Sequence, residues 1–435
     1  MPGPFRFLRG ALCVLGLVLL VGVLHGPVTA EEEKYEPGVP DAELQAEIDR
    51  AIDTGVEWLV GKQSSNGGFG GLNASGNLHY EMGTTALAGL ALLAGGRKRG
   101  DPTVEKVYLH LVEQGRRHGD TASTSTYDAG VALMFITAYW RGEESEQAGR
   151  GKRPRRGVKN PCNLPSKESQ WPGGKDPRKW IKQLTSFLVR KRKMATSTWG
   201  YPAHRDDHSN TQYAFLGLRA ARDCGMTVPD LVFVTAAETM MSRQEPEGPK
   251  VPRIIVSTDP NQSDYVVGYD RARGWSYMQE PFLPCGSMTT SGIAVLAICH
   301  DALTNPKRAV KYDSKMERRL TTAVADGFAW LDKNWSVKDN PPLGRTWHLY
   351  YLYGLERASI FGGKNLIGKH DWYVEGARVL VDKQEGEGSW STGTMGGDGT
   401  FEPNDAVDTA WAILFLARST RPMPPIPAPV VTPGD

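Results

Sequence analysis

The strongest constraint on the fold of this chain is a helical pattern that is apolar on nearly every side. It is clearest in Asp405-Ala-Val-Asp-Thr-Ala-Trp-Ala-Ile-Leu-Phe-Leu, near the end of the chain. Such a helix cannot face water, so other helices must surround it. The helix-forming stretch before it, Gly376–Gln384, is more polar and suited to that covering role. The two stretches predict an inner helix packed behind an outer one.

The same pair of patterns recurs throughout the chain. Near the start, Gly55–Gln63 precedes a Gly/Phe turn, and the apolar run Gly83–Leu93 follows it. A paired-helix unit cannot bury its apolar face alone, so such units stack. We predict six pairs: Asp41–Lys62 with Tyr80–Ala94, Val104–Gln114 with Thr121–Trp140, Pro177–Lys193 with His208–Ala221, Pro229–Arg243 with Thr289–His300, Met316–Asn334 with Arg345–Ile360, and Gly376–Gln384 with Asp405–Arg418.

Six pairs with apolar inner helices favour closure into a ring. The inner helices would then surround a central cavity, with the outer helices around them; an open stack is the alternative. Alternating β-branched runs with hairpin turns are scarce, so the predicted fold class is all-α. Two insertions, Arg141–Asp176 and Gln244–Arg273, are expected as long surface loops, the second with a strand-like run from Arg253 to Ser257.

The two ends of the chain predict export and disorder. Arg6 and Arg9 precede an apolar run that is short for a membrane span, and the small residues at 28–30 are typical of a cleaved secretory signal. We therefore expect a signal peptide at 1–30, a disordered lead-in at 31–40, one domain at 41–420 and a Pro-rich disordered tail at 421–435. An uncleaved anchor is the alternative to a cleaved signal.

Charge and cysteine content exclude some classes of protein. Loss of the signal removes two of 51 basic residues, leaving 49 against 49 acidic ones, so nothing favours a nucleic-acid partner. The basic runs 150–159 and 190–193 are compatible with a membrane surface or an anionic glycan but do not require one. The cysteines of the mature chain form no zinc-ribbon spacing, and we expect buried free thiols at Cys162, Cys224, Cys285 and Cys299, although an oxidising compartment would permit disulfides.

Two turns carry a more specific signal. Leu59 and Gln63 are followed by Gly67-Gly68-Phe69, and Leu380 and Gln384 by Gly388-Ser389-Trp390. This pattern resembles the QW repeat of the squalene and oxidosqualene cyclases and the protein-prenyltransferase β subunits, in the terpenoid cyclase superfamily. The resemblance implies an α/α toroid with its ligand site in the ring centre. It also implies that Gln63, Phe69, Gln384 and Trp390 lock the outer helices and have a structural role.

The catalytic motifs of that family are missing. The cyclases protonate an alkene with an Asp-x-Asp-Asp acid, to which the nearest approach here is Arg205-Asp206-Asp207; capping of the next helix is the favoured role of this pair. The prenyltransferases bind zinc through Asp-x-Cys and a histidine. Asp-x-Cys is absent, although His348 lies near the expected histidine and Cys285 and Asp405 open flanking inner helices. We predict neither a metal nor a cofactor.

Polar and aromatic residues collect where the inner helices begin, and ring closure would bring them to one mouth. The predicted cavity residues are His79, Tyr80, Glu81, Tyr127, His208, Asn210, Tyr213, Trp347, Tyr351 and Trp411. The candidates for acid–base chemistry are Asp128, Asp405, Asp408 and His348. Local roles compete with these: helix capping for the three aspartates and a hydrogen-bonded structural role for His348.

Three functions remain open. The favoured one is an exported toroid that binds a hydrophobic or glycan ligand, or a protein partner, without chemistry. The second is an isoprenoid-processing enzyme of the cyclase or prenyltransferase kind. The third is a carbohydrate-active enzyme whose paired carboxylates act across the cavity, which depends on a separation that the sequence does not give.

Overall fold

Twelve α-helices, alternating between an outer and an inner position, make up most of the described chain. The computed structural model describes residues 36–69, 81–118, 125–141, 162–201, 205–257, 262–304, 312–392, 405–424 and 426–429. The outer helices are α1 (Ala42–Lys62), α3 (Pro102–His118), α5 (Pro177–Lys191), α7 (Asp230–Ser242), α9 (Ser314–Lys333) and α11 (Trp372–Lys383). The inner helices are α2 (Glu81–Ala94), α4 (Thr126–Tyr139), α6 (His208–Asp223), α8 (Gly286–Leu303), α10 (His348–Gly362) and α12 (Asp405–Leu416).

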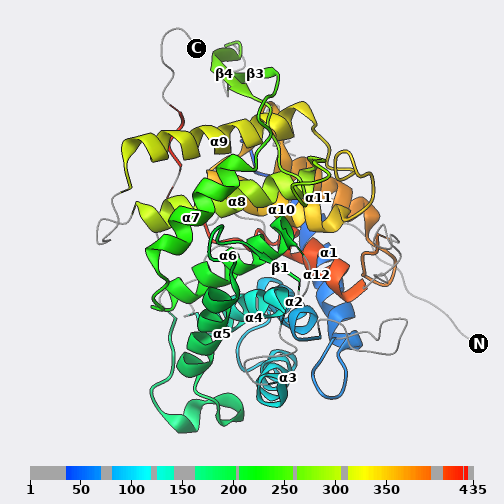
Figure 1. The fold of residues 1–435 in the computed structure, drawn as a ribbon. Helices are drawn as coiled ribbons and strands as arrows, with labels where there is room; N and C mark the ends of the chain where they lie inside the picture. Colours follow the sequence, from blue (N-terminus) through cyan, green and yellow to red (C-terminus); the bar gives the residue numbers. More distant parts are fainter. Residues whose placement is uncertain are drawn as a thin grey trace, which may run out of the picture. The chain divides into compact units, whose positions relative to one another are not determined.

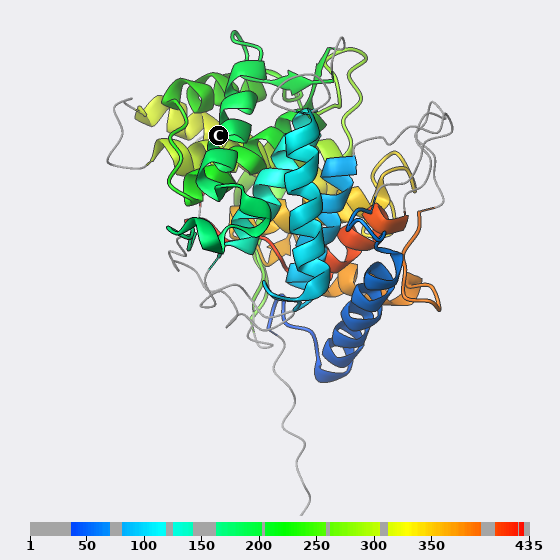
Figure 2. The same ribbon diagram turned by 90° about the horizontal axis from the view of Figure 1, so that it is seen from below.

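The inner helices form a closed ring. Each of α2, α4, α6, α8 and α10 contacts the next inner helix, and α12 contacts α2 (Figure 1). The outer helix α1 packs against α12, so the first and last repeats meet, as Figure 2 shows for the blue and red helices. The predicted all-α ring is confirmed, and the open stack is excluded.

Burial follows the division between inner and outer helices. Every residue of α8 except Asp301 is buried, as expected for a helix that is apolar all round. Helix α1 instead buries one stripe, which includes Leu44, Ile48, Ile52 and Leu59, and turns its remaining faces outward. The prediction that the more polar helices lie in the outer layer and the apolar ones in the inner layer therefore holds for α1 and α8.

The repeat glutamines join consecutive outer helices. Gln63 Nε2 donates to the carbonyl of Thr103 in α3 (3.0 Å), which links the first repeat to the second. Gln384 Nε2 donates to Ala51 O and Thr54 Oγ1 of α1, both at 2.9 Å, and to Gly388 O of its own corner. The glutamine of the last repeat thus closes the ring.

A third glutamine that joins two outer helices was not predicted from the sequence. Gln244 Nε2 donates to Arg273 O and to Ala323 O of α9, both at 2.9 Å. The aromatic residue of this repeat is Trp275, whose Nε1 donates to Met240 O (2.8 Å). The insertion between Gln244 and Trp275 hides the pattern from a search for short spacing.

A threonine of the inner helix completes four of these corners. The backbone N–H of Trp390 donates to Thr409 Oγ1 at 3.1 Å, and Trp390 Nε1 donates to Leu380 O of α11 at 2.7 Å. One aromatic residue thus fixes an inner helix to an outer one. Equivalent aromatic–threonine pairs are Phe69 with Thr85, Trp199 with Thr211, and Trp275 with Thr289.

The segment after α12 crosses one end of the ring. Thr420 donates through its N–H (2.9 Å) and its hydroxyl (2.6 Å) to Glu356 of α10. The next carbonyl, that of Arg421, accepts from Arg219 of α6 at 2.9 Å. Because α6 and α12 lie on opposite sides of the six-helix ring, residues 417–424, here called the C-terminal strap, pass beneath its axis.

The described residues include parts of both ends that were predicted to be disordered. The strap includes residues 421–424, and its Met423 is buried. At the other end, Gly38 N–H donates to Asp371 at 2.6 Å, and Gly38 O accepts from Arg418 at 2.5 Å. Residues 1–35, with the predicted signal peptide, lie outside the described residues.

The expectation of four free thiols is wrong for one pair. Cys162, in the insertion after α4, forms a disulfide with Cys224 at the end of α6. Pairing between residues 62 positions apart cannot be deduced from the sequence alone. Cys285 and Cys299 are buried free thiols, as predicted.

The second insertion forms an antiparallel hairpin of β3 (Lys250–Ile255) and β4 (Tyr265–Arg271) that projects beside α9 (Figure 1). The strand expected around Arg253 is therefore present. Two short hairpins, β1 (Trp199–Gly200) with β2 (Asp206–Asp207) and β5 (Leu366–Ile367) with β6 (His370–Asp371), lie directly before α6 and α11. No helix among the described residues combines the length and apolar character that crossing a membrane requires.

Candidate ligand site at the ring axis

The starts of several inner helices are tied to one another. Gly83 N–H of α2 donates to Asp128 of α4 at 2.8 Å. Ser291 of α8 donates to His208 O of α6 at 3.0 Å. Tyr350 Oη of α10 lies 3.2 Å from Ser209 Oγ of α6. These contacts gather polar groups from five of the six repeats at one end of the ring, opposite the C-terminal strap.

Aromatic rings cross the axis just inside this end. Tyr127 of α4 meets Tyr213 of α6 at 4.8 Å between ring centroids, and Tyr213 stacks on Tyr350 of α10 at 6.1 Å. Tyr350 in turn lies 5.4 Å from Trp411 of α12. We call these four residues the aromatic belt. Since α6 and α12 lie on opposite sides of the ring, the belt spans it.

Arg357 lies beyond the belt on α10. It is seven residues after Tyr350 and therefore on the same face of the helix. Only 1% of it is exposed, and its guanidinium carbon is 3.8 Å from the ring centroid of Tyr353 and 5.8 Å from that of Tyr213. Arginine stays charged in proteins, and although burial opposes that charge, the pKa of Arg357 is raised.

The guanidinium has no hydrogen-bond partner among the described residues. This holds for Nε, Nη1 and Nη2 of Arg357. Glu356, the next residue along α10, is held by Thr420 of the strap; its charge acts on Arg357 electrostatically, but it forms no hydrogen bond with the guanidinium. Burial is the largest influence on Glu356 and raises its pKa to about 7. An unpaired buried cation is costly, so its presence calls for an explanation.

Other buried polar atoms beside the aromatic belt are also left without partners. Trp411 Nε1 and Gln212 Nε2 are buried and make no hydrogen bond with a described residue, although Gln212 Oε1 accepts from Tyr350 Oη at 2.7 Å. Burial raises the pKa of Tyr213, and nearby Arg357 and Trp411 oppose the rise. Arg357 and Trp411 are therefore close enough to the Tyr213 hydroxyl to act on its pKa through hydrogen bonding, but neither contact has the distance and angles of a well-formed hydrogen bond.

The predicted carboxylates mostly bind backbone groups. Asp128 forms a capping box with Ser125 and also accepts from Gly83, as the capping interpretation expects. Asp408 accepts from the N–H and the hydroxyl of Thr392, at 2.8 and 2.9 Å. Its burial raises its pKa to about 6. Asp405 is exposed at the first position of α12.

The predicted histidines have structural surroundings. His348 Nε2 lies 2.9 Å from Val337 O, as the hydrogen-bonded alternative expects, and burial lowers its pKa to about 4. Burial likewise lowers the pKa of His208 to about 4. In the described part of the chain, no three His, Cys, Asp or Glu side chains are placed to hold a metal ion, and this includes His348, Cys285 and Asp405.

The remaining predicted cavity residues are scattered. Glu81 lies 3.0 Å from His110 of the outer helix α3, and Asn210 donates to Asp207. Tyr351 donates to Ser336 O (3.0 Å) in the corner before α10, and Trp347 is 38% exposed just before that helix. His79 and Tyr80 lie outside the described residues. Of the predicted set, Tyr127, Tyr213 and Trp411 are the members of the aromatic belt.

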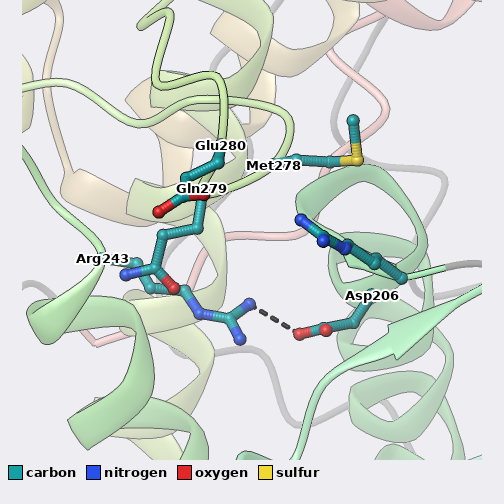
Figure 3. Close-up of a pocket in the computed structure, with 6 residues that line it drawn as sticks. Asp206, Arg243, Met278, Gln279 and Glu280 are labelled. Carbon is teal, nitrogen blue, oxygen red and sulfur yellow. Dashed lines mark ion pairs between the residues drawn. The ribbon is translucent and has the colours of Figure 1, made fainter.

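The Arg205-Asp206-Asp207 segment forms a separate feature. Asp207 caps α6 by accepting from Asn210 N–H at 2.7 Å, and burial raises its pKa to about 6. Asp206 pairs with Arg243 and Lys193, each at 2.7 Å, and its pKa is lowered. The Asp206–Arg243 pair lies in a pocket of about 290 Å³ (Figure 3), lined by Arg205, Asp206, Arg243, Met278, Gln279 and Glu280.

Comparisons with known proteins bear on the fold. No protein-family model matches the chain, and no curated protein does. Among solved structures, a variant of the type II terpene cyclase MstE from Scytonema matches with a TM-score of 0.50 and 12% identity, over 86% of this chain and 98% of that one. The apo form of MstE itself gives a TM-score of 0.48 at 12% identity with the same coverage. The chain has the terpene-cyclase toroid fold. Activity is a separate matter that must be argued from the site.

Sequence analysis missed several residues of this site, including Arg357, Gln212 and Tyr350. Arg357 follows Glu356, and an adjacent acid–base pair in a helix is typical of a solvated face. The available signal was its position: it lies seven residues after Tyr350 in a helix that is otherwise apolar. A charged residue on such a helix has no solvated face to occupy.

Proposed function

We propose that this protein is an exported toroid that binds an apolar, isoprenoid-like small molecule at the ring axis and does not transform it. The aromatic belt carries this proposal. Tyr127, Tyr213, Tyr350 and Trp411 come from four different repeats and converge on the axis. Aromatic side chains with a few fixed polar groups are typical of small-molecule sites.

An apolar ligand fits this site better than a glycan. Recognition of a sugar calls for carboxylates and amides directed at its hydroxyl groups. The carboxylate of Asp128 instead accepts from Gly83 N–H and the Ser125 hydroxyl, and that of Asp408 accepts from Thr392. The belt itself offers mainly ring faces and edges, which pack against hydrocarbon without requiring hydrogen bonds.

Binding without chemistry agrees with the missing motifs. The full sequence contains neither Asp-x-Asp-Asp nor Asp-x-Cys. One observation favours the second candidate, an acid-catalysed isoprenoid cyclase. Asp408 lies three residues before Trp411 and so on the same face of α12, and burial raises its pKa to about 6. A carboxyl group of that kind can hold a proton for transfer.

Export is supported by two features. The first thirty residues have the composition of a secretory signal. The Cys162–Cys224 disulfide is of the type that persists in oxidising compartments. Mass spectrometry of protein recovered from an exporting host should find Glu31 as the first residue. An N-terminus that still carries residues 1–30 would refute cleavage of the signal.

Titration calorimetry tests ligand binding directly. Geranylgeraniol should bind to the purified full chain, whereas maltoheptaose should not. Tyr350→Leu should weaken the binding about tenfold, because one ring of the belt is lost. Tyr351→Leu is the matched control, since this buried neighbour donates to Ser336 and is outside the belt. Binding of maltoheptaose alone, or equal effects of the two variants, would overturn the proposal.

The enzyme alternative is tested on the same material. Incubation with geranylgeranyl substrates, followed by mass and chromatographic analysis of products, should return the substrates unchanged. A cyclised product that disappears in Asp408→Asn would replace the binding proposal by the cyclase one.

A further inference from the structure

The groups around Arg357 form an excess of hydrogen-bond donors. Three guanidinium nitrogens of Arg357 and the indole N–H of Trp411 are buried without a hydrogen bond to any described residue, and both side chains lie beside Tyr213. Buried polar groups in proteins are almost always paired, so a cluster of orphaned donors indicates a missing acceptor. A negatively charged acceptor would satisfy these donors and also compensate the buried charge of Arg357.

We infer that the ligand at the ring axis is an amphiphilic anion whose carboxylate is bound by Arg357. This inference rests on the proposed function and adds the chemical class of the ligand's polar end. A guanidinium presents paired N–H groups in a planar fork that matches the two oxygens of a carboxylate. The indole N–H of Trp411 and the Tyr213 hydroxyl can donate further bonds to the same oxygens.

The protein does not supply this anion itself. Glu356 is adjacent in sequence, but both of its oxygens accept from Thr420 of the strap. Asp408 accepts from Thr392 near the start of α12. No ion pair joins Arg357 to any carboxylate in the described part of the chain, and its closest aromatic partner, Tyr353, is neutral because burial raises its pKa to about 12.

The donors and the belt form one continuous site. Tyr213 belongs to both: its ring stacks on Tyr350, and its hydroxyl lies beside Arg357 and Trp411. Along α10, Tyr350 lies near the start of the helix, and Arg357 lies seven residues on, next to the residue that binds the strap. The carboxylate is therefore directed toward the closed end of the ring, and the apolar part of the ligand lies against the belt.

The charge of the site favours a carboxylate over a diphosphate. A diphosphate carries two or more negative charges and is usually held by several cations or a metal ion. Arg357 brings one positive charge to the belt, with its guanidinium 5.8 Å from the ring centroid of Tyr213. One charge is suited to one carboxylate.

Titration calorimetry with a matched pair of ligands tests the inference. Geranylgeranoic acid and geranylgeraniol have the same apolar chain and differ in the terminal group. At neutral pH the acid should bind about 10- to 100-fold more tightly, as expected for hydrogen bonds to a charged group. Arg357→Met should abolish this preference and leave the affinity for the alcohol within about threefold of wild type.

A milder variant keeps the test valid if Arg357→Met does not fold. Trp411→Phe retains a belt ring and removes only the indole N–H, so it should weaken the acid about threefold to tenfold and the alcohol less. Acetate and inorganic phosphate are included to separate binding of the head group from binding of the whole amphiphile. Both should bind at least about 100-fold more weakly than the acid, because they lack the apolar chain and the free energy of burying it.

The outcomes separate the two proposals. If acid and alcohol bind equally, or if the acid retains its advantage in Arg357→Met, the carboxylate site is refuted while the apolar site stands. If neither binds, the proposed function fails and the inference fails with it. Phosphate binding as tight as that of the acid would overturn the amphiphile and indicate a simple anion site.

Discussion

Replacing Gln384 by alanine should destabilise the protein by about 3 kcal/mol. Its Nε2 donates at 2.9 Å to Ala51 O and Thr54 Oγ1 of α1 and to Gly388 O of its own corner, so it helps to join the last corner to α1. A typical intramolecular hydrogen bond contributes about 1 kcal/mol net, and the variant also leaves carbonyl groups of the corner without this donor. The lost stability therefore comes from contacts that close the ring.

Scanning calorimetry measures this loss. The 400 residues from Glu36 to Asp435 form one unit, and unfolding entropy is about 2 cal/mol/K per residue, so 3 kcal/mol corresponds to a decrease in Tm of about 4 °C. Gln244→Ala removes two comparable bonds and should lower Tm by about 2 to 3 °C. Lys333→Ala, on the exposed surface of α9, is the control. A Gln384→Ala variant no less stable than Lys333→Ala would refute the reasoning that this glutamine closes the ring.

Two further predictions follow from buried groups. The folded-state pKa of Asp408 is raised from 3.8 to about 6, so folding favours its protonated form, and its stabilising effect is present at low pH and lost as pH rises through about 6. Urea titrations should therefore show Asp408→Asn gaining about 3 kcal/mol relative to wild type between pH 4 and 7, and a constant difference would contradict the burial of this carboxyl group. The Cys162–Cys224 disulfide closes a loop of 62 residues, so a Cys162→Ala, Cys224→Ala double variant should lose about 4 kcal/mol of stability. Thiol titration of the denatured, signal-free protein should find only Cys285 and Cys299 reactive, and four reactive thiols would exclude the disulfide.

The helical ring was predictable because it depends on a repeated and physically unambiguous pattern. A helix such as α8, buried at nearly every position, can exist only inside a layer of other helices. The two end repeats were recognisable because Gln63 and Gln384 lie close in sequence to their aromatic partners. Gln244 makes the same kind of lock, but the β3–β4 hairpin separates it from Trp275 and removes the short-range signal.

The site was only partly predictable because it depends on which side chains face the axis. Tyr213 and Trp411 were found from their position near the starts of inner helices. Tyr351 met the same criterion but donates to Ser336, while its neighbour Tyr350 reaches the axis. A rotation of one residue along a helix, about 100°, separates these outcomes, and an all-apolar helix gives no periodicity from which to choose.

A crystal structure of the protein soaked with geranylgeranoic acid tests the central claim most directly. The account predicts electron density for the apolar chain against Tyr213, Tyr350 and Trp411, with the carboxylate in contact with the guanidinium of Arg357. Density in the pocket beside Asp206 and Arg243, or an unchanged arrangement of the belt at a ligand concentration that saturates binding in solution, would contradict it.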